Sequence, residues 1–440
     1  MDKVLRLPQT AKAPNVEPLV KATLRETREH NERLVLATIY DDGPVSRAEI
    51  ARLTGLTRTT VSDVVEGLIA SGMTREIGRG PSTGGKAPIL LEVPDAARLL
   101  IGVDLGDRVF SAATVNLRGE ILQRIEVPSE HADGDRAVAL ALELIERILA
   151  MADGPVLGVG IGAPGLIDTA SGTVIRAVMR DWRELALGKI VADRFAMPVR
   201  IANDSQAGAL AEYVFGATRG RNLVVVKVGE GIGAGLVLNG SLFEGDRFGA
   251  GEIGHTVVNP AGDPCRCERR GCLETVASTR AVLAMLEPVL GGPVSLERAV
   301  AAFERGDERV TAAVREAGSQ LGIALAGLIG TLHVRRLILA GTMAAFGDGW
   351  LEAVREAATS RCLPALAEDT TFELGPIDDI IILGASALLM TSELGLRLQP
   401  IRRPRPRPAE AVSEAHLAAL RVTPTARPGE LAALRGGSTS

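Results

Sequence analysis

Residues 251–274, GEIGHTVVNPAGDPCRCERRGCLE, carry the pattern that decides the fold. His255 is followed by Cys265, Cys267 and Cys272, in the spacing His-x9-Cys-x-Cys-x4-Cys. One imidazole and three thiolates complete a tetrahedral zinc shell and leave no open position, which is typical of a structural site. We therefore expect Zn²⁺ to fix a loop that is too short to fold by itself. The alternative is a set of free buried cysteines.

The composition bounds the class of protein. The chain has 440 residues, of which 46% are hydrophobic and 23% charged, so more than one globular core is expected. Its net charge of −5 argues against a surface coated with basic groups for nonspecific nucleic-acid binding. Cys362 stands apart from the other cysteines and is expected to be an inert core thiol. The sequence has neither a signal-peptide core nor an apolar run long enough for a membrane helix, so we expect a cytoplasmic protein that binds no membrane.

Short apolar runs alternate with helical stretches after residue 98, which predicts an α/β body. The expected strands are 100–103, 156–161, 199–202, 223–228 and 337–340. A strand, glycine loop, strand and tight turn occur at 101–119 and again at 225–240. This echo fits two related lobes and fits equally well a chance likeness of two hairpins. The predicted organisation is a flexible N-terminus (1–27), a DNA-binding domain (28–95), a two-lobed body (98–396) and a disordered Pro/Arg-rich tail (399–440).

The N-terminal region has the pattern of a winged helix-turn-helix. Ser46 is expected to cap a helix, with Glu49 reaching back in a capping box. Gly55 permits a sharp turn, and Thr57 caps a second helix. The predicted apolar stripe of that second helix is Val61, Val64, Val65, Leu68 and Ile69.

The polar start of the second helix lies where a recognition helix meets base edges, and a two-stranded wing is expected over 77–91. The residues expected to contact DNA are Arg47, Thr57, Arg58, Thr59, Thr60 and Ser62 in the helices, with Arg79 and Lys86 in the wing. A homodimer or higher homo-oligomer is expected, because two recognition helices must reach adjacent half-sites of a double-stranded operator. The alternative is a helical interaction domain without a DNA role.

The run 251–274 resembles the signature of the ROK family, which contains repressors, open reading frames and sugar kinases. Further matches are GAPGLID at 162–168, Asn203-Asp204, and GIGAG at 231–235. The resemblance spans roughly residues 30–396. It implies that the body has a two-lobed actin-like or hexokinase-like (ribonuclease-H-like) ATPase fold, with sugar held between the lobes.

The resemblance also implies a sugar-binding set, whose members are Gly165, Asn203, Asp204, Glu252, His255 and Glu274. Carboxylates accept hydrogen bonds from sugar hydroxyls, an amide donates and accepts, and zinc would fix His255 in one tautomer. The expected effector is a monosaccharide or an amino sugar. In family kinases, the aspartate matching Asp204 takes the proton of the attacking hydroxyl. Without this set, Asn203-Asp204 would be interpreted as a helix cap after a strand.

The chain departs from the family's kinases in the loops that would hold ATP. The kinase pattern Asp-x-Gly-Gly-Thr is DLGDR at 104–108, Gly-Thr-Gly is GEG at 229–231, and the adenosine segment with two successive glycines is LAGTM at 339–343. Each new carboxylate about 4 Å from a phosphate oxygen costs on the order of 4 kcal/mol, although magnesium or the new arginine could offset part of it. We therefore predict a sugar-responsive DNA-binding regulator, a repressor by family precedent, with no catalytic residue. The alternative is an active ATP-dependent sugar kinase with Asp204 as its base.

Overall fold

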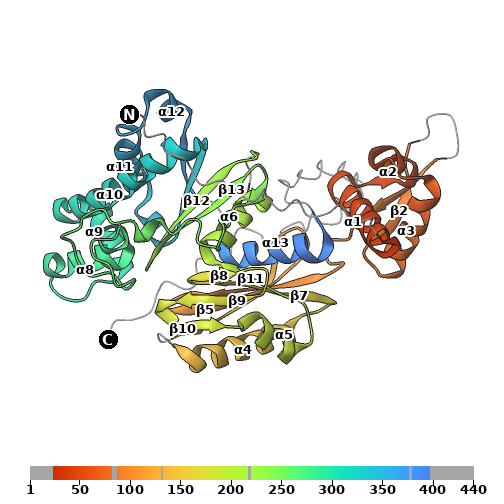
Figure 1. Ribbon diagram of the computed structural model, residues 1–440, viewed down its shortest axis with the longest axis horizontal. Helices are drawn as coiled ribbons and strands as arrows, with labels where there is room; N and C mark the ends of the chain where they lie inside the picture. The colour runs from red at the N-terminus through yellow and green to blue at the C-terminus, as the bar shows by residue number, and fades with distance from the viewer. Residues whose placement is uncertain (1–22, 82–86, 130–131, 217–219, 376–378, 397–440) are drawn as a thin grey trace, which may run out of the picture. The chain divides into compact units, whose positions relative to one another are not determined.

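The computed structural model describes residues 23–81, 87–129, 132–216, 220–375 and 379–396 (Figure 1). Lys86, the tail 399–440 and most of the expected flexible N-terminus lie outside these residues.

The N-terminal module is a winged helix-turn-helix, as predicted. Its elements are α1 (Leu24–Asp42), β1 (Val45–Ser46), α2 (Arg47–Thr54), α3 (Arg58–Ala70), β2 (Arg75–Arg79) and β3 (Ile89–Glu92). The wing is an antiparallel sheet in which β3 lies between β1 and β2. Helix α1 begins inside the segment expected to be flexible, because Thr23 and Glu26 form a capping box at its start.

The turn between α2 and α3 forms as expected, with one difference. Ser46 Oγ accepts a hydrogen bond from the Glu49 backbone, but the Glu49 carboxylate pairs with Arg52 instead of completing a capping box. Gly55 follows α2 with a φ of 72°, in the left-handed region that glycine adopts without strain. Thr57 then caps α3 by accepting a hydrogen bond from the Thr60 backbone.

The core of the module lies among α1, α2, α3 and β3. Val61, Val65 and Leu68 of the predicted stripe are buried, and Val64 is partly buried. Ile69 is 36% exposed, so its place in the stripe was predicted wrongly. It follows Leu68 by one residue, which turns its side chain away from the core face.

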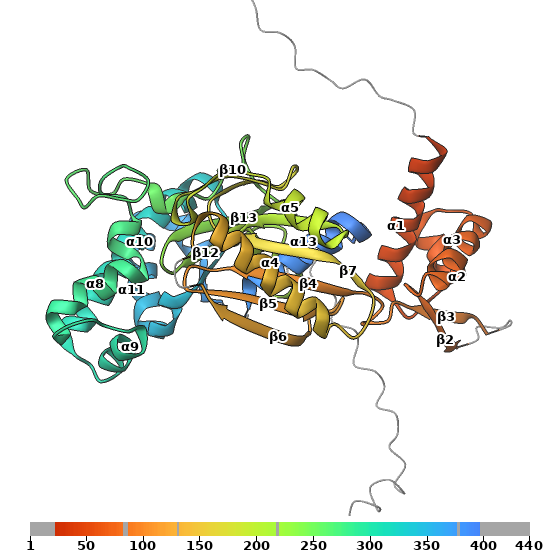
Figure 2. The ribbon, with the colours of Figure 1, turned by 90° about the horizontal axis from the view of Figure 1, so that it is seen from below.

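The first lobe of the body is built on a five-stranded sheet in the order β11-β7-β4-β5-β6. Its strands are β4 (Leu99–Leu105), β5 (Val109–Val115), β6 (Ile121–Pro128), β7 (Val156–Ala163) and β11 (Val199–Asn203). A small sheet and short elements complete the lobe: α4 (Gly134–Met151), β8 (Leu166–Asp168), β9 (Thr173–Ala177), η1 (Val178–Arg180), β10 (Trp182–Leu185) and α5 (Leu187–Phe195). Helix α4 packs on β4, β5 and β6 (Figure 2).

The second lobe is built on a sheet in the order β14-β13-β12-β15-β16. Its strands are β12 (Leu223–Val228), β13 (Ile232–Leu238), β14 (Ser241–Leu242), β15 (Arg336–Ala340) and β16 (Thr371–Leu374). Its outer helices are α8 (Thr279–Leu290), α9 (Leu296–Glu304), α10 (Glu308–Leu332), η3 (Thr342–Phe346), α11 (Gly347–Thr359) and α12 (Pro364–Asp369).

The two sheets have the same topology. In each, the first three strands along the chain pair antiparallel, the fourth adds in parallel beside the first, and the fifth adds in parallel beside the fourth. The repeated strand, glycine loop and strand pattern is therefore an architectural repeat. Helices α6 (Asp204–Phe215) and α13 (Ile380–Leu394) pack on each other, with α13 against β4 and β7 and α6 against β12 and β13 (Figure 1). Gly384 allows their close approach, because a Cβ there would lie 1.7 Å from the Ala207 carbonyl oxygen.

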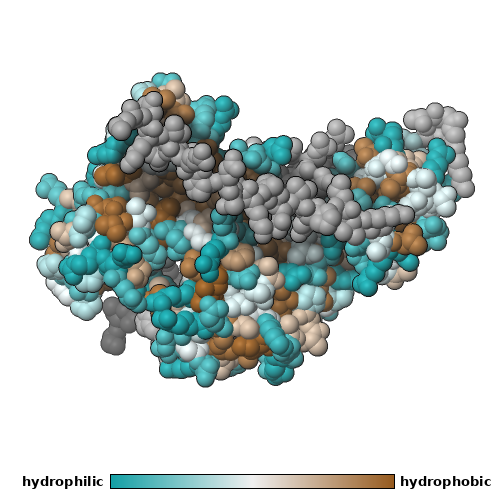
Figure 3. Space-filling model, in the orientation of Figure 1, coloured by the Kyte–Doolittle hydropathy of each residue, from teal (hydrophilic) through white to brown (hydrophobic). Residues whose placement is uncertain are grey.

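The predicted α/β class is confirmed, and each expected strand lies within or overlaps an observed one. Among the described residues, no helix combines the length and apolarity that a membrane span requires. The face shown in Figure 3 alternates hydrophilic residues with separate hydrophobic patches.

Candidate functional site

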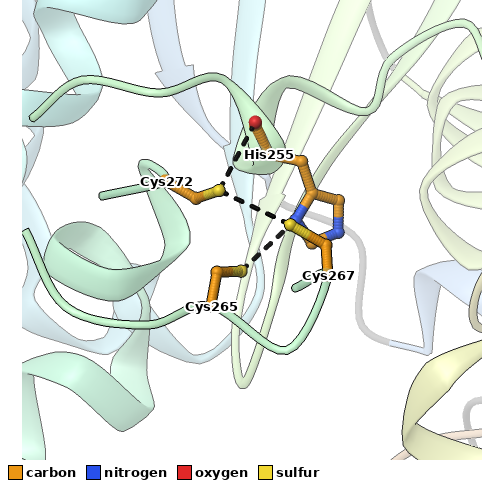
Figure 4. Close-up of side chains that lie close together, drawn as sticks. All are labelled: His255, Cys265, Cys267 and Cys272. Atoms are coloured by element: carbon orange, nitrogen blue, oxygen red, sulfur yellow. Dashed lines mark hydrogen bonds between the residues drawn. The ribbon is translucent and has the colours of Figure 1, made fainter. Parts of the chain in front are cut away.

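The four predicted metal ligands converge (Figure 4). His255 ends the short helix η2 (Ile253–His255), and its Nδ1 lies 3.6 Å from Cys265 Sγ. Cys267 Sγ lies 3.6 Å from Cys272 Sγ, and all four ligand atoms are within 4.8 Å of one another. Zinc–sulfur bonds of about 2.3 Å imply edges of about 3.8 Å between tetrahedral ligands. The cluster therefore has the dimensions of a tetrahedral metal site.

The loop between the cysteines folds back through a glycine. Gly271 has a φ of 68°, and a Cβ at this position would lie 1.5 Å from the Asn259 carbonyl oxygen. Cys272 can then pair with Val257 in an antiparallel bridge, which brings its Sγ to 3.5 Å from the His255 carbonyl oxygen. A glycine immediately before the last cysteine is thus required by the close backbone approach.

The protonation of Cys272 depends on whether the cluster holds a cation. Burial, with hydrogen bonds that the Cys272 thiol donates to Cys267 and Cys265, raises the pKa of Cys272 to about 12. A thiol with such a pKa stays protonated near neutrality, whereas a bound metal ion holds it as a thiolate. The donor set and its spacing therefore fit a metal ion.

Asn203 joins two of the predicted sugar-binding positions. Its side-chain oxygen caps α6 by accepting hydrogen bonds from the backbones of Ser205 and Gln206. Its Nδ2 donates to the Gly165 carbonyl oxygen at 3.0 Å. The helix-cap interpretation is correct for this side chain, and the cap also fixes the amide beside Gly165.

Charged members of the predicted set gather beside the cluster of His255 and the three cysteines. The Glu252 carboxylate lies 3.9 Å from His255 Nε2. Burial is the main cause that raises the pKa of Glu252. The charges of Asp204 and Glu274 also raise this pKa, whereas the nearby His255 lowers it. Glu274 begins helix α7 (Glu274–Ala277) and accepts a hydrogen bond from the Ile232 backbone at 3.4 Å. Three carboxylates and an imidazole thus lie in one region.

Lys227 is a functional candidate that the sequence interpretation missed. Its Nζ lies 2.6 Å from Asp204 Oδ2, with side chains that are 26% and 19% exposed. Burial lowers the pKa of Lys227, but the carboxylates of Asp204 and Asp104 outweigh it, so the pKa is raised. A lone lysine in the apolar run 223–228 was the signal that could have revealed this ion pair.

The two loops expected to be altered phosphate loops are joined by a second ion pair. Each loop connects two antiparallel strands, β4 to β5 in one lobe and β12 to β13 in the other. Arg108 of the first loop donates from Nε to Glu230 Oε1 of the second at 3.1 Å. Arg108 is 66% exposed, so this contact contributes little stability in water.

The predicted DNA-contacting residues lie mostly at the start of α3. The exposed members there are Thr57, Arg58 and Thr59, and the partly buried ones are Thr60 and Ser62. Arg79 is exposed at the end of β2, while Lys86 lies outside the described residues. Arg47 pairs with Glu76 of β2 at 2.9 Å, so its guanidinium group braces the wing against α2.

The end of α1 is attached to the body through Arg118, in the turn between β5 and β6. The Arg118 guanidinium group lies 4.1 Å from the centroid of the Tyr40 ring and donates to the Asp95 carboxylate. The Tyr40 hydroxyl donates to the Leu117 carbonyl oxygen. These contacts connect the winged helix, the segment after the wing and the first lobe.

Comparison with known proteins identifies the family. Residues 100–391 match the ROK family, and residues 28–73 match the winged helix-turn-helix DNA-binding family. The chain belongs to the ROK family. Among its ROK relatives, the xylose repressor of Caldicellulosiruptor bescii is 32% identical, with 83% of this chain and 96% of that repressor covered.

Solved ROK structures show both regulators and kinases. A ROK family transcriptional regulator, a homologue of the E. coli MLC protein, superposes with a TM-score of 0.74 at 25% identity, covering 84% of this chain and 98% of that one. A ROK glucokinase from Streptomyces griseus, in complex with glucose and AMPPNP, superposes with a TM-score of 0.60 at 27% identity, covering 66% of this chain and 98% of that one. The predicted two-lobed, sugar-kinase-like fold is thereby confirmed.

Proposed function

We propose that this chain is a transcriptional repressor whose affinity for operator DNA changes when a monosaccharide binds. The observation that carries the proposal is the presence of a winged helix-turn-helix and a ROK body in one chain, aligned with nearly the whole length of a xylose repressor. Residues 28–95 are the DNA-binding domain in this proposal, and residues 98–396 bind the sugar.

The sugar site consists of Gly165, Asn203, Asp204, Glu252, His255 and Glu274. Its carboxylates accept hydrogen bonds from sugar hydroxyls, and the Asn203 amide, fixed by its cap, can present its remaining donor. The effect of the Asp204 and Glu274 charges on Glu252 supports this grouping. Hydroxyl donors would relieve the mutual repulsion of these carboxylates, which favours a polyhydroxylated neutral ligand.

Zinc is the metal that we assign to His255, Cys265, Cys267 and Cys272. Three thiolates and one imidazole suit zinc, and four protein ligands leave no position for a reactive water. The ion would have a structural role: it would hold the loop 256–271 and orient His255.

The DNA-binding surface comprises the start of α3 and the wing. Arg58 and Thr59 would contact base edges, with Thr57, Thr60 and Ser62 beside them, because these residues begin the second helix of the motif. Arg79 and Lys86 would contact phosphates, and Arg47 would position the wing. A homodimer would place two such helices on adjacent half-sites.

A sugar kinase is the second candidate, and likeness to the glucokinase complex with glucose and AMPPNP favours it. The Lys227–Asp204 ion pair and the acidic residues of both loops support the repressor instead. The ammonium group of Lys227, at 2.6 Å, occupies an oxygen of the carboxylate that would act as base. Incubation with ATP, magnesium and a hexose panel should give no sugar phosphate at enzyme-like rates, and turnover of any hexose would overturn this choice.

The repressor proposal is tested with the full-length protein. Thermal shifts against D-xylose, D-glucose and N-acetyl-D-glucosamine identify the effector, since a ligand of the folded state raises its stability. Duplexes selected by the protein from a random pool then serve in fluorescence anisotropy with and without that sugar. The expected result is salt-dependent binding that the sugar weakens. Binding that no sugar alters would contradict the proposal.

A further inference from the structure

Three carboxylates lie at the junction of the two lobes. Asp104 is near the end of β4, Asp107 follows in the same loop, and Asp204 begins α6. The charge of Asp204 acts on both of the others, and burial raises the pKa of Asp107 and that of Asp104. Such a group of carboxylates requires a nearby cation, because mutual repulsion is strong where water is scarce.

The alternation of side chains along β12 places Lys227 at this junction. Val224, Val226 and Val228 pack in the core on the α10 side of the sheet, whereas Val225 packs in the cluster that contains residues of α6. Lys227 shares the face of Val225, since side chains on a strand alternate. Its ammonium group therefore meets Asp204, the first residue of α6, at 2.6 Å.

Lys227 is also a countercharge for Asp104 in the opposite lobe. Asp104 Oδ1 is buried and has no hydrogen-bond partner among the described residues. Burial raises the pKa of Asp104 to about 7, and the charge of Lys227 is the leading influence that lowers it. The same ammonium group thus acts on carboxylates of both lobes.

Two arginines supply further positive charge around the junction. Arg180 donates to the Gly106 and Ala132 carbonyl oxygens, and its charge acts on Asp107 and Asp104. Arg108 pairs with Glu230. Cationic side chains of the chain itself therefore lie at the loops in which a kinase binds magnesium and the nucleotide phosphates.

We propose that Lys227 is a positioning residue that acts as the internal cation of this junction, so that the sugar site assembles without nucleotide or divalent metal. The inference rests on the proposed sugar-binding function and deepens it. Lys227 holds the Asp204 carboxylate in place as a hydrogen-bond acceptor for a sugar hydroxyl and supplies a countercharge to Asp104. The sugar is then bound as an unmodified monosaccharide, independently of ATP.

The test compares full-length wild type with Lys227→Met, which keeps the length of the side chain and removes its charge. Calorimetric titration with D-xylose, D-glucose or N-acetyl-D-glucosamine is performed in magnesium-free buffer and again with millimolar Mg²⁺. No chelator is added, so that the cysteine cluster is undisturbed. Lys189→Met is the matched control, since Lys189 is exposed and pairs with Asp193 on α5.

Wild type and Lys189→Met should bind the sugar equally well in both buffers. Lys227→Met should bind it about tenfold or more weakly without magnesium, because an uncompensated carboxylate remains in a partly buried site. Millimolar Mg²⁺ should restore most of the loss, since the carboxylates that Lys227 no longer neutralises can then bind a divalent ion. The double variant Asp104→Asn/Lys227→Met should respond less to Mg²⁺, because one oxygen ligand is gone.

Two results would overturn the inference: a magnesium requirement in the wild type, or a Lys227→Met variant whose affinity is unchanged or insensitive to magnesium. If this variant is too unstable for titration, Mg²⁺ should still raise its unfolding temperature and not that of wild type, and equal responses would count against the inference. If the wild type binds none of the sugars, the proposed function itself fails. That outcome is distinct from sugar binding that does not depend on Lys227.

Discussion

The guanidinium group of Arg118 lies over the ring of Tyr40, 4.1 Å from its centroid, and its Nη1 donates to the Tyr40 carbonyl oxygen. Burial raises the pKa of Tyr40 to about 12, so its hydroxyl remains a donor to Leu117 at every physiological pH. The backbone carbonyl group and the hydroxyl group of Tyr40 thus both attach the last turn of α1 to the β5–β6 turn. A change in the body can reach the winged helix through this attachment.

Arg118→Ala should uncouple sugar binding from DNA binding. We expect sugar and DNA affinities, measured separately, to stay within about threefold of wild type, while the sugar-induced change in DNA affinity falls about fivefold or more. Anisotropy titrations with and without the sugar measure this coupling. Arg25→Ala, which removes an exposed arginine of α1, is the control. Full coupling in Arg118→Ala would show that the signal takes another route.

Arg58→Ala should weaken operator binding by about tenfold or more, because a side chain that reads a base edge contributes about 1–3 kcal/mol. Arg52→Ala is the matched control: Arg52 is exposed in the neighbouring helix α2 and pairs with Glu49. Sugar affinity should remain unchanged in both variants. Equal losses in the two variants would indicate a general charge effect instead of recognition by α3.

Cys267→Ser should reduce the bound zinc well below about one ion per chain, lower the unfolding temperature and abolish sugar binding. The physical reason is that the loop 256–271 loses its tether and His255 its orientation. Elemental analysis, thermal unfolding and sugar titration check the three effects. Cys362→Ser, outside the cluster, should change none of them. A Cys267→Ser protein that binds sugar normally would separate the metal from the sugar site.

Glu212→Gln should remove a pH dependence of stability. Burial raises the pKa of Glu212 from 4.5 to about 7, and neither carboxylate oxygen has a hydrogen-bond partner among the described residues. Because the pKa is raised in the folded state, protonated Glu212 contributes to the free energy of unfolding. This contribution is fully present below pH 4.5 and is lost as the pH rises through about 7.

Between about pH 5 and pH 9, the free energy of unfolding should therefore fall by about 2 kcal/mol more in wild type than in Glu212→Gln. Denaturant titrations at both pH values measure the difference. The exposed Glu146, which pairs with Arg194, provides the control Glu146→Gln. The nearby charges of Arg336 and Glu373 are common to all three proteins. Parallel pH profiles would refute the assignment.

Local features of the site could be predicted from the sequence because their causes are local. The Thr57 cap, the left-handed turn at Gly55 and the convergence of the cysteines depend on residues close in the chain. The capping-box role of Glu49 was wrong, because Arg52 competes for its carboxylate one turn away. Sequence spacing indicates which partners are possible, and it does not rank them.

The ion pairs at the junction of the two lobes could not be predicted in the same way. Lys227 meets Asp204, and Arg108 meets Glu230, only after two lobes have formed around α6 and α13. The residues of the second pair are 122 positions apart. The sequence interpretation took the acidic residues of the loops as repulsive to phosphate and allowed for an offset by Arg108, but it did not identify Glu230 as the partner of that arginine.

His255 belongs both to the proposed zinc ligands and to the proposed sugar-binding set. Through this one imidazole, the activity of the regulator would depend on two nutrients, zinc and the sugar. In a cell starved of zinc, newly made protein would still have its winged helix and bind its operator, yet it would not bind the sugar. The genes under its control would stay silent in the presence of their inducer until the supply of metal returned.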